Sequence, residues 1–145
     1  NPCPCGYYGD NLKECFCTPQ QIKRYRQRIS GPLLDRFDLQ VEVPRLTLEE
    51  LQTSVKGESS RQIRERVEQA RIRQRERLLI CGLENNAEMG SRELEEFCRL
   101  DNASRSLLQQ AFKQLGLSAR AYDRILRVAR TIADLAGDEQ IQDQP

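Results

Sequence analysis

Four cysteines near the start of the chain form two C-x-C pairs, Cys3 with Cys5 and Cys15 with Cys17. Residues two apart in an extended chain point to the same side, so each pair presents two thiols toward one point. Four thiolates are a typical ligand set for tetrahedral Zn²⁺, and such a site leaves no coordination position open for catalysis. The sequence therefore predicts a structural zinc site on these four cysteines.

The residues around the cysteines favour a reversal of the chain between the two pairs. Pro2 and Pro4 keep the backbone extended around Cys3, whereas Gly6 and Gly9 permit the tight turns that bring the second pair back. Two disulfides or unpaired thiols remain alternatives, because the more familiar zinc spacing, C-x-x-C, is absent. The cytoplasmic location that we expect disfavours disulfides.

The chain contains no histidine, which removes the commonest general acid–base and the Ser-His-Asp and Cys-His nucleophile schemes. Stand-alone hydrolytic chemistry is therefore not expected. The net charge is +1, so any attraction to nucleic acid must come from a local patch. No apolar run is long enough for a bilayer span, and we expect no membrane partner. Because the first residue is Asn1 rather than Met, we interpret the chain as a fragment.

Two arginines lie at positions where they could contact an anion. Arg36 follows a predicted helix and precedes a predicted strand, and it could simply pair with Asp35 or Asp38. Arg120 lies two residues into a helix predicted to begin at Ser118, where its charge opposes the helix dipole. A cation at that end is better explained if an anion also binds there. Local pattern alone assigns neither arginine a role.

Residues 61–77 are rich in arginine, with a local net charge of +4 from seven arginines and three glutamates. Arg61 and Arg64 each have a glutamate four residues later, so the pattern favours a solvated helix face with internal ion pairs. Aromatic residues that could stack on bases are absent from this segment, which argues against single-strand binding there.

Helix signals alternate with turns in the first part of the chain. A capping box at residues 18–21 predicts a helix over Pro19–Ser30, which Gly31 ends. Residues 38–43 alternate polar and apolar types, the pattern of a half-covered strand. A second capping box at residues 47–50 predicts a short helix, and residues 55–58 are interpreted as a linker.

Beyond the linker only helices are predicted. Their ranges are 59–79, 91–99, 103–115 and 118–136, with N-caps at Ser59 or Ser60, Ser91, Asp101 or Asn102, and Ser118, and with terminating glycines at 116 and 137. Three apolar stripes are expected to form the core. They are Ile63, Val67, Ala70 and Leu78, then Leu107, Leu108, Ala111 and Phe112, then Tyr122, Ile125, Ala129 and Ile132. Cys81 and Cys98, beside apolar neighbours, are predicted to be buried.

Three segments resemble the ComM/YifB family of magnesium-chelatase-like AAA+ proteins. They are residues 1–6 (NPCPCG), 30–39 (SGPLLDRFDL) and 118–135 (SARAYDRILRVARTIADL). The resemblance implies a mainly α chain. Residues 1–57 would be the C-terminal end of an AAA+ αβα core, with one or two short strands and a Cys-rich zinc-binding loop. Residues 58–137 would be a helical lid domain, and residues 138–145 a disordered tail.

The same resemblance implies roles for three residues. Asn1 would be the sensor-1 asparagine that polarises the attacking water, and Arg36 the arginine finger that reaches ATP on the neighbouring subunit. Arg120 would be the sensor-2 arginine of the lid. The chain contains no G-x-x-x-x-G-K-[ST] loop, so it is expected to be inactive alone and to use ATP and Mg²⁺ only in a longer protein.

In that longer protein the resemblance implies an ATP-driven DNA helicase, which drives branch migration in recombination of incoming DNA, as in natural transformation. The expected partners are its own N-terminal ATPase core, neighbouring subunits of a hexameric ring, and DNA. Two alternatives remain open. One is a non-enzymatic, zinc-stabilised module that binds DNA through the arginine-rich helix, and the other is the ATPase subunit of a porphyrin magnesium chelatase.

Overall fold

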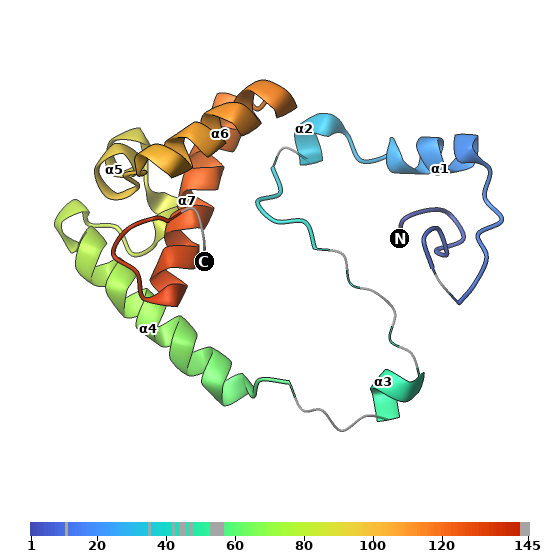
Figure 1. Ribbon diagram of the computed structural model, residues 1–145, viewed down its shortest axis with the longest axis horizontal. Coiled ribbons are helices and arrows are strands. Elements are labelled where there is room, and N and C mark those ends of the chain that lie inside the picture. The colour runs from blue at the N-terminus through green and yellow to red at the C-terminus, as the bar shows by residue number, and fades with distance from the viewer. Residues whose placement is uncertain are drawn as a thin grey trace. The chain divides into compact units, whose positions relative to one another are not determined.

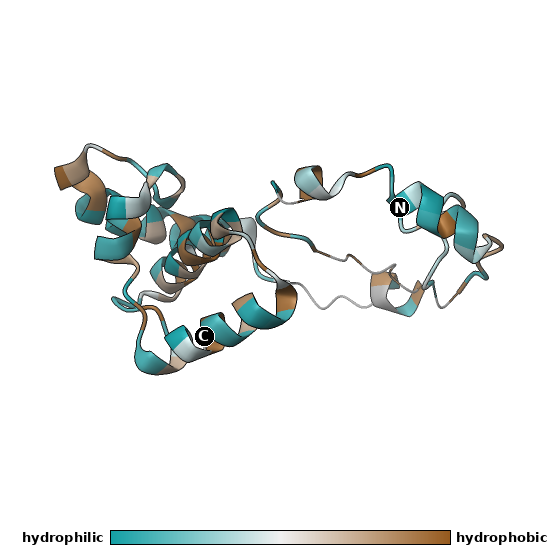
Figure 2. Cartoon of the chain, turned by 90° about the horizontal axis from the view of Figure 1, so that it is seen from above, coloured by the Kyte–Doolittle hydropathy of each residue, from teal (hydrophilic) through white to brown (hydrophobic). Residues whose placement is uncertain are grey.

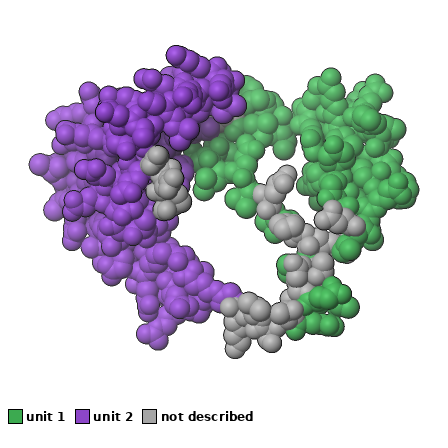
Figure 3. Space-filling view, in the orientation of Figure 1, with its two compact units in different colours: residues 1–55 green, residues 56–145 purple. Residues whose placement is uncertain are grey.

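The computed structural model divides the chain into two compact units, Asn1–Val55 and Lys56–Pro145 (Figure 3). The residues that it describes are 1–10, 12–34, 36–41, 43, 46, 48–52 and 57–142. Within them, regular structure is helical, and the one isolated β-bridge runs parallel between Leu100 and Ile141. The mainly α fold predicted from the sequence is therefore confirmed.

The described residues of the first unit form three short helices (Figure 1), which are α1 (Pro19–Arg26), α2 (Gly31–Leu34) and α3 (Leu48–Gln52). The predicted capping box of α1 is confirmed, because Thr18 Oγ1 accepts from the Gln21 backbone N–H at 3.3 Å and Gln21 Oε1 accepts from the Thr18 N–H at 2.8 Å. The helix ends at Arg26, four residues before the predicted end, and tighter turns follow it. The predicted N-cap Thr47 lies outside the described residues.

The strand predicted over residues 38–43 is not present in the described part of that segment, which omits Glu42. Its apolar side chains face solvent, with exposed fractions of 70% for Leu39, 79% for Val41 and 86% for Val43. A strand is held by hydrogen bonds to a neighbouring strand, and the described part of the first unit has none to offer. The alternating pattern alone therefore does not produce a strand.

The second unit is a helical bundle (Figure 1). It comprises α4 (Ser60–Leu78), α5 (Ser91–Phe97), α6 (Asn102–Leu115) and α7 (Ala119–Ala136), with 3₁₀ turns η1 (Leu79–Cys81) and η2 (Asn86–Glu88). Ser59, Asp101 and Ser118 are the N-caps of α4, α6 and α7, as predicted. Gly90 rather than Ser91 caps α5, because the Glu93 side chain accepts from the Gly90 N–H at 2.8 Å.

The buried apolar cluster of this unit agrees with the predicted stripes in part, because Leu78 belongs to it and Leu108 and Ala129 pack against it. Its members are Leu78, Met89, Leu94, Cys98, Leu126, Ala133 and Ile141. Of the predicted residues, Ile63, Val67, Leu107 and Ile132 are instead about half exposed. Helical periodicity locates a buried face only to within about one residue. On α7 the buried face includes Arg130 and Asp134, and Ile132 lies outside it.

A buried carboxylate joins the elements of this unit. Asp134 of α7 has no exposed surface, and both its oxygens accept hydrogen bonds from Arg77 of α4, at 2.7 Å each. Asn86 of η2 donates to the same carboxylate at 2.8 Å, and Arg130 Nε donates at 3.2 Å. Because a buried charge is tolerated only when it is paired and hydrogen-bonded, these contacts specify how α4, η2 and α7 pack together.

The segment predicted as a disordered tail, 138–145, contacts the bundle in its described part, residues 138–142. Arg130, which is 2% exposed, donates to the carbonyl oxygens of Asp138 at 2.5 Å and Glu139 at 2.7 Å. Ile141 is buried in the apolar cluster. Residues 143–145 lie outside the described part, and the disorder of the whole segment stays a prediction.

Among the described residues, no helix combines the length and the apolar character that crossing a bilayer requires.

Replacing Asp134 by Ala would leave Arg77 and Arg130 without their shared carboxylate in a buried site. Breaking a buried ion pair from one side costs about 3–5 kcal/mol, so we expect the free energy of unfolding of the second unit to fall by about that amount. Urea unfolding followed by circular dichroism measures it. The matched control Glu68→Ala, at an exposed site on α4, should change stability by less than about 0.5 kcal/mol. A loss no larger than the control's would contradict the role of the network.

Acid should weaken the same network. Burial raises the pKa of Asp134, but hydrogen bonds from Arg77 and Asn86, with the charges of Arg77 and Arg130, lower it below its ordinary value of 3.8. A lowered folded-state pKa stabilises the fold above the unfolded-state pKa, and this contribution is lost as the pH falls through the folded-state value. The stability difference between the natural chain and Asp134→Asn should therefore be constant near neutral pH and shrink below about pH 4. Urea midpoints across this range measure it, and a difference independent of pH would contradict the assignment.

Candidate metal centre and arginine positions

The four predicted cysteines come together in the structure. The Sγ atoms of Cys3 and Cys5 are 3.3 Å apart, and Cys15 Sγ lies 3.7 and 3.6 Å from them. With Cys17, all four sulfur atoms lie within 4.8 Å of one another. Tetrahedral Zn–S bonds of 2.3 Å place thiolates about 3.8 Å apart. None of the cysteines forms a disulfide, so the four thiols could hold one metal ion.

Two glycines shape the loop that carries these thiols. Gly6 and Gly9 have φ values of +86° and +82°, in the left-handed region that favours glycine. The Gly6 N–H donates to the Cys3 carbonyl at 3.1 Å, which closes the first turn. Asp10 Oδ1 accepts from the backbone N–H groups of Leu12 at 2.7 Å and Lys13 at 3.1 Å and orders the return. The predicted reversal of the chain is confirmed.

Helix α1 continues directly from the second cysteine pair, with Thr18 as the N-cap after Cys17. Arg26 Nε, at the far end of α1, donates to the Pro2 carbonyl at 3.2 Å. This contact joins the loop and the helix into one substructure, because Pro2 and Arg26 lie at opposite ends of the segment.

The thiols influence one another's protonation. Burial raises the pKa of Cys3, but hydrogen bonds from the Cys5 and Cys15 thiols and from the Tyr8 and Gly6 backbone N–H groups lower it to about 6. A backbone hydrogen bond from Cys17 lowers the pKa of Cys15, but burial and the neighbouring thiols raise it to about 12. The thiolate form is therefore favoured at Cys3 and disfavoured at Cys15, as expected where several negative charges would lie close together. A cation at the centre would remove that opposition.

The other two cysteines behave differently from each other. Cys98 is buried in the apolar cluster, as predicted, and burial raises the pKa of its thiol to about 11. Cys81 is only partly buried, at the end of η1, so the prediction of burial holds for Cys98 alone. Neither lies in the four-cysteine cluster.

Asn1, Arg36 and Arg120 are all exposed; the first two lie in the first unit and Arg120 lies in the second. Arg36 follows α2, and its Nη1 donates to the Pro32 carbonyl at 2.7 Å. The side chain of Asn1 lies beside Gly6 of the cysteine loop. Arg120 lies in the first turn of α7, where Ser118 Oγ accepts from the Ala121 N–H at 3.1 Å. The roles of Asn1, Arg36 and Arg120 stay predictions, since each is described within its own unit.

The arginine-rich helix α4 directs part of its charge inward. Arg77 binds Asp134, and Arg73 Nη1 donates to the Asp134 carbonyl at 2.9 Å. Arg61 pairs with Glu65 at 2.9 Å, as predicted, and Arg66 pairs with Glu58 at 2.7 Å. The helix therefore offers fewer cations to an anionic partner than its composition indicates.

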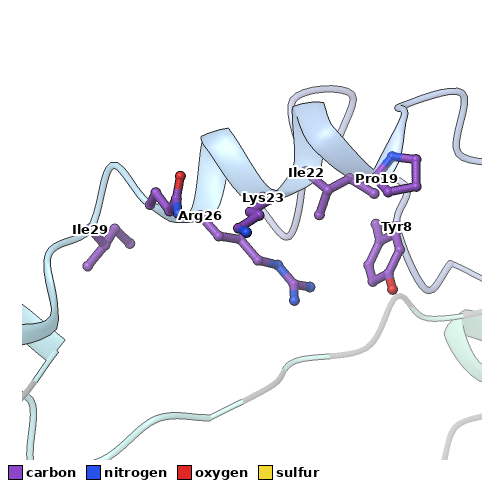
Figure 4. Close-up of a pocket in the computed structure, with 7 residues that line it drawn as sticks. Tyr8, Pro19, Ile22, Lys23, Arg26 and Ile29 are labelled. Atoms are coloured by element: carbon purple, nitrogen blue, oxygen red, sulfur yellow. The ribbon is translucent and has the colours of Figure 1, made fainter.

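A groove between the cysteine loop and α1 was not predicted from the sequence. It has a volume of about 560 Å³ and is lined by Tyr8, Pro19, Ile22, Lys23, Arg26, Gln27 and Ile29 (Figure 4). The available signal was the interleaving of basic and aromatic residues over residues 7–28.

Comparison with protein families gives matches along most of the chain. Residues 57–145 match the family described as magnesium chelatase, subunit ChlI C-terminal. Residues 1–51 match the family described as magnesium chelatase, subunit ChlI.

Individual relatives agree with the family matches. Competence protein ComM of Haemophilus influenzae is 48% identical over 97% of this chain. The YifB proteins of Escherichia coli and Salmonella typhimurium are 45% and 43% identical over 93% and 99% of it. The chain spans about a quarter of the length of these relatives, 27%, 26% and 28% respectively. With a family match over most of its length and this identity across both units, the chain belongs to the ComM/YifB family of magnesium-chelatase-like proteins.

Proposed function

We propose that the chain is the C-terminal part of a ComM-type AAA+ ATPase, a hexameric motor that uses ATP and Mg²⁺ to drive branch migration of DNA during recombination of incoming DNA. The observation that carries the proposal is the 48% identity to Competence protein ComM over 97% of the chain. The phosphate loop absent from these residues would belong to an N-terminal core of the longer protein.

Arg36 suits a residue that acts on a neighbouring subunit. Its guanidinium is exposed and is held by a hydrogen bond to the Pro32 carbonyl of its own turn. Giving up this hydrogen bond between a charged guanidinium and a neutral carbonyl costs about 1.5–3 kcal/mol. A charge-assisted, bidentate contact to a phosphoryl group more than offsets that cost. The side chain can therefore swing from its own turn to the γ-phosphate, where it would neutralise developing charge.

Arg120 suits a nucleotide sensor. It lies on the exposed first turn of α7, beside backbone N–H groups that point out of the helix N-terminus. The guanidinium and the helix dipole both favour an anion at this end. A phosphate bound there would pull on the whole of α7, whose other end is anchored through Asp134. Asn1 would be the sensor-1 residue that orients the attacking water.

For the cysteine cluster we propose structural Zn²⁺. Four sulfur ligands fill the tetrahedral coordination, so the ion would hold the loop in shape and would supply no catalytic position. Cys3, Cys5, Cys15 and Cys17 would each contribute one thiolate.

The family description magnesium chelatase favours a second candidate, the ATPase subunit of an enzyme that inserts magnesium into a porphyrin. The paired cysteines and the identity to ComM favour the DNA motor. The DNA-binding module built on the arginine-rich helix is less favoured, because Arg73 and Arg77 of α4 bind within the fold.

A mixing experiment tests the role of Arg36. In the longer protein, Arg36→Ala and a phosphate-loop variant should each lower ATP hydrolysis, roughly a thousandfold for the loss of an arginine finger. Mixed rings should regain part of the activity, since an intact loop on one subunit then meets an intact finger from the next. Steady-state ATP hydrolysis over a range of mixing ratios measures it.

The matched control for this test is Arg105→Ala, at an exposed arginine of α6, which should leave ATP hydrolysis unchanged. Arg36→Lys should remain impaired, because lysine lacks the planar fork. The assignment would be wrong if no mixing ratio restored activity while both variants still formed rings.

Metal analysis tests the zinc proposal. The chain purified without added metal should contain close to one zinc ion per molecule, and Cys17→Ser should lose most of it because one of four ligands is removed. Cys81→Ser, outside the cluster, is the matched control and should keep its zinc. Negligible metal in the natural chain, or disulfides found by mass spectrometry, would refute the proposal.

A further inference from the structure

The groove between the cysteine loop and α1 combines an apolar wall with a cationic rim. The ring of Tyr8 and the side chains of Pro19, Ile22 and Ile29 form the wall. Figure 4 shows Arg26 extending from α1 on the side of the helix where Tyr8 lies. None of the seven lining residues is acidic. A ligand that fits must therefore bring a flat or apolar group together with negative charge.

One cation of the groove is held in position. Arg26 is anchored by its hydrogen bond to the Pro2 carbonyl, and its guanidinium carbon lies 5.0 Å from the centroid of the Tyr8 ring. Lys23 lies one turn before it on α1, next to the buried Ile22. Helix α1 as a whole is mainly hydrophilic (Figure 2). The helix contains no acid that could neutralise these cations internally.

The cysteine cluster positions the aromatic side of the groove. Tyr8 lies in the loop between the two cysteine pairs, and its backbone N–H donates to the thiol of Cys3. Lys13 Nζ similarly lies 5.0 Å from the centroid of the Tyr7 ring. The loop therefore presents aromatic faces next to cations, and Phe16, which is 84% exposed, adds a further apolar surface to it.

We propose that this groove binds single-stranded nucleic acid. An unpaired base would stack against Tyr8 and Ile22, while Lys23 and Arg26 contact the adjoining phosphates. Aromatic platforms beside a basic groove are the general means of binding single strands without sequence preference. A duplex hides its base faces, so it would gain only the phosphate contacts. The volume of about 560 Å³ is within the range of small-ligand sites and has room for a nucleotide.

The inference deepens the proposed DNA-directed function by assigning a contact site. The arginine-rich part of helix α4 has basic residues but no aromatic residue on which a base could stack. The groove has both kinds of residue, so the same criterion favours it. Binding of an oligonucleotide to this chain can be measured without ATP and without a neighbouring subunit. Its failure would therefore leave the mixing experiment on Arg36 as an independent test of the motor.

Fluorescence anisotropy of a labelled oligothymidine of about 12 nucleotides, titrated with the 145-residue chain at several low salt concentrations, tests the proposal. We expect saturable binding that is tighter than for a duplex of the same length. Tyr8→Ala should weaken binding by at least about fivefold through loss of stacking, whereas Tyr8→Phe, which keeps the ring, should bind as the natural chain does. Lys23→Ala should reduce the salt-dependence slope by about 0.7 through loss of one phosphate contact.

Lys113→Ala is the matched control for Lys23→Ala, since both lysines lie in the last turn of a helix. It should leave the affinity and the slope unchanged. Because Lys23 is exposed, its replacement should preserve the fold, which circular dichroism checks. The proposal is overturned if the single strand does not bind, if the duplex binds equally well, or if the two lysine variants weaken binding equally. Displacement of the oligonucleotide by polyglutamate at equal charge would also overturn it, in favour of an acidic peptide.

Discussion

The buried carboxylate of Asp134 determines how the second unit is assembled. Arg77 from α4, Asn86 from η2 and Arg130 from α7 converge on it, and Arg130 also holds the backbone of residues 138–139. Apolar contacts alone permit helices to slide and rotate at small cost, whereas a buried charge tolerates few arrangements. The network therefore links α4, η2 and α7 directly to one another. Under the proposed function, a pull on Arg120 at the other end of α7 would move these linked elements together.

The first unit depends on a different constraint. Among its described side chains, only Cys3 and Ile22 are buried, so a hydrophobic core contributes little to its order. Small folds of this kind are commonly held by a metal or by disulfides. The cysteine loop supplies four converging thiols, and α1 is joined to it through Arg26. The same loop presents Tyr8, so the residues that would bind metal also shape the proposed nucleic-acid groove.

The candidate sites were predictable to different degrees. Residue type and spacing were enough for the cysteine cluster, because C-x-C pairs and intervening glycines restrict where the thiols can point. The groove could not be predicted with the same ease, since Tyr8 and Ile22 meet only after the loop folds back on α1. The side chains of Arg36 and Arg120 are exposed, so each guanidinium could contact an anion. The roles predicted for them rest on family resemblance.

The sequence by itself determined the features that depend on neighbours along the chain. The capping box at Thr18, the N-cap at Ser59 and the terminating glycine at 137 lie where they were predicted, because the groups that satisfy a helix end are within four residues of it. Only the tertiary structure decided which faces are buried, that Asp134 is the centre of an ion-pair network, and that Ile141 packs in the apolar cluster. Those outcomes require atoms distant in sequence, such as Arg77 some fifty-seven residues before Asp134, and local pattern carries no information about such partners.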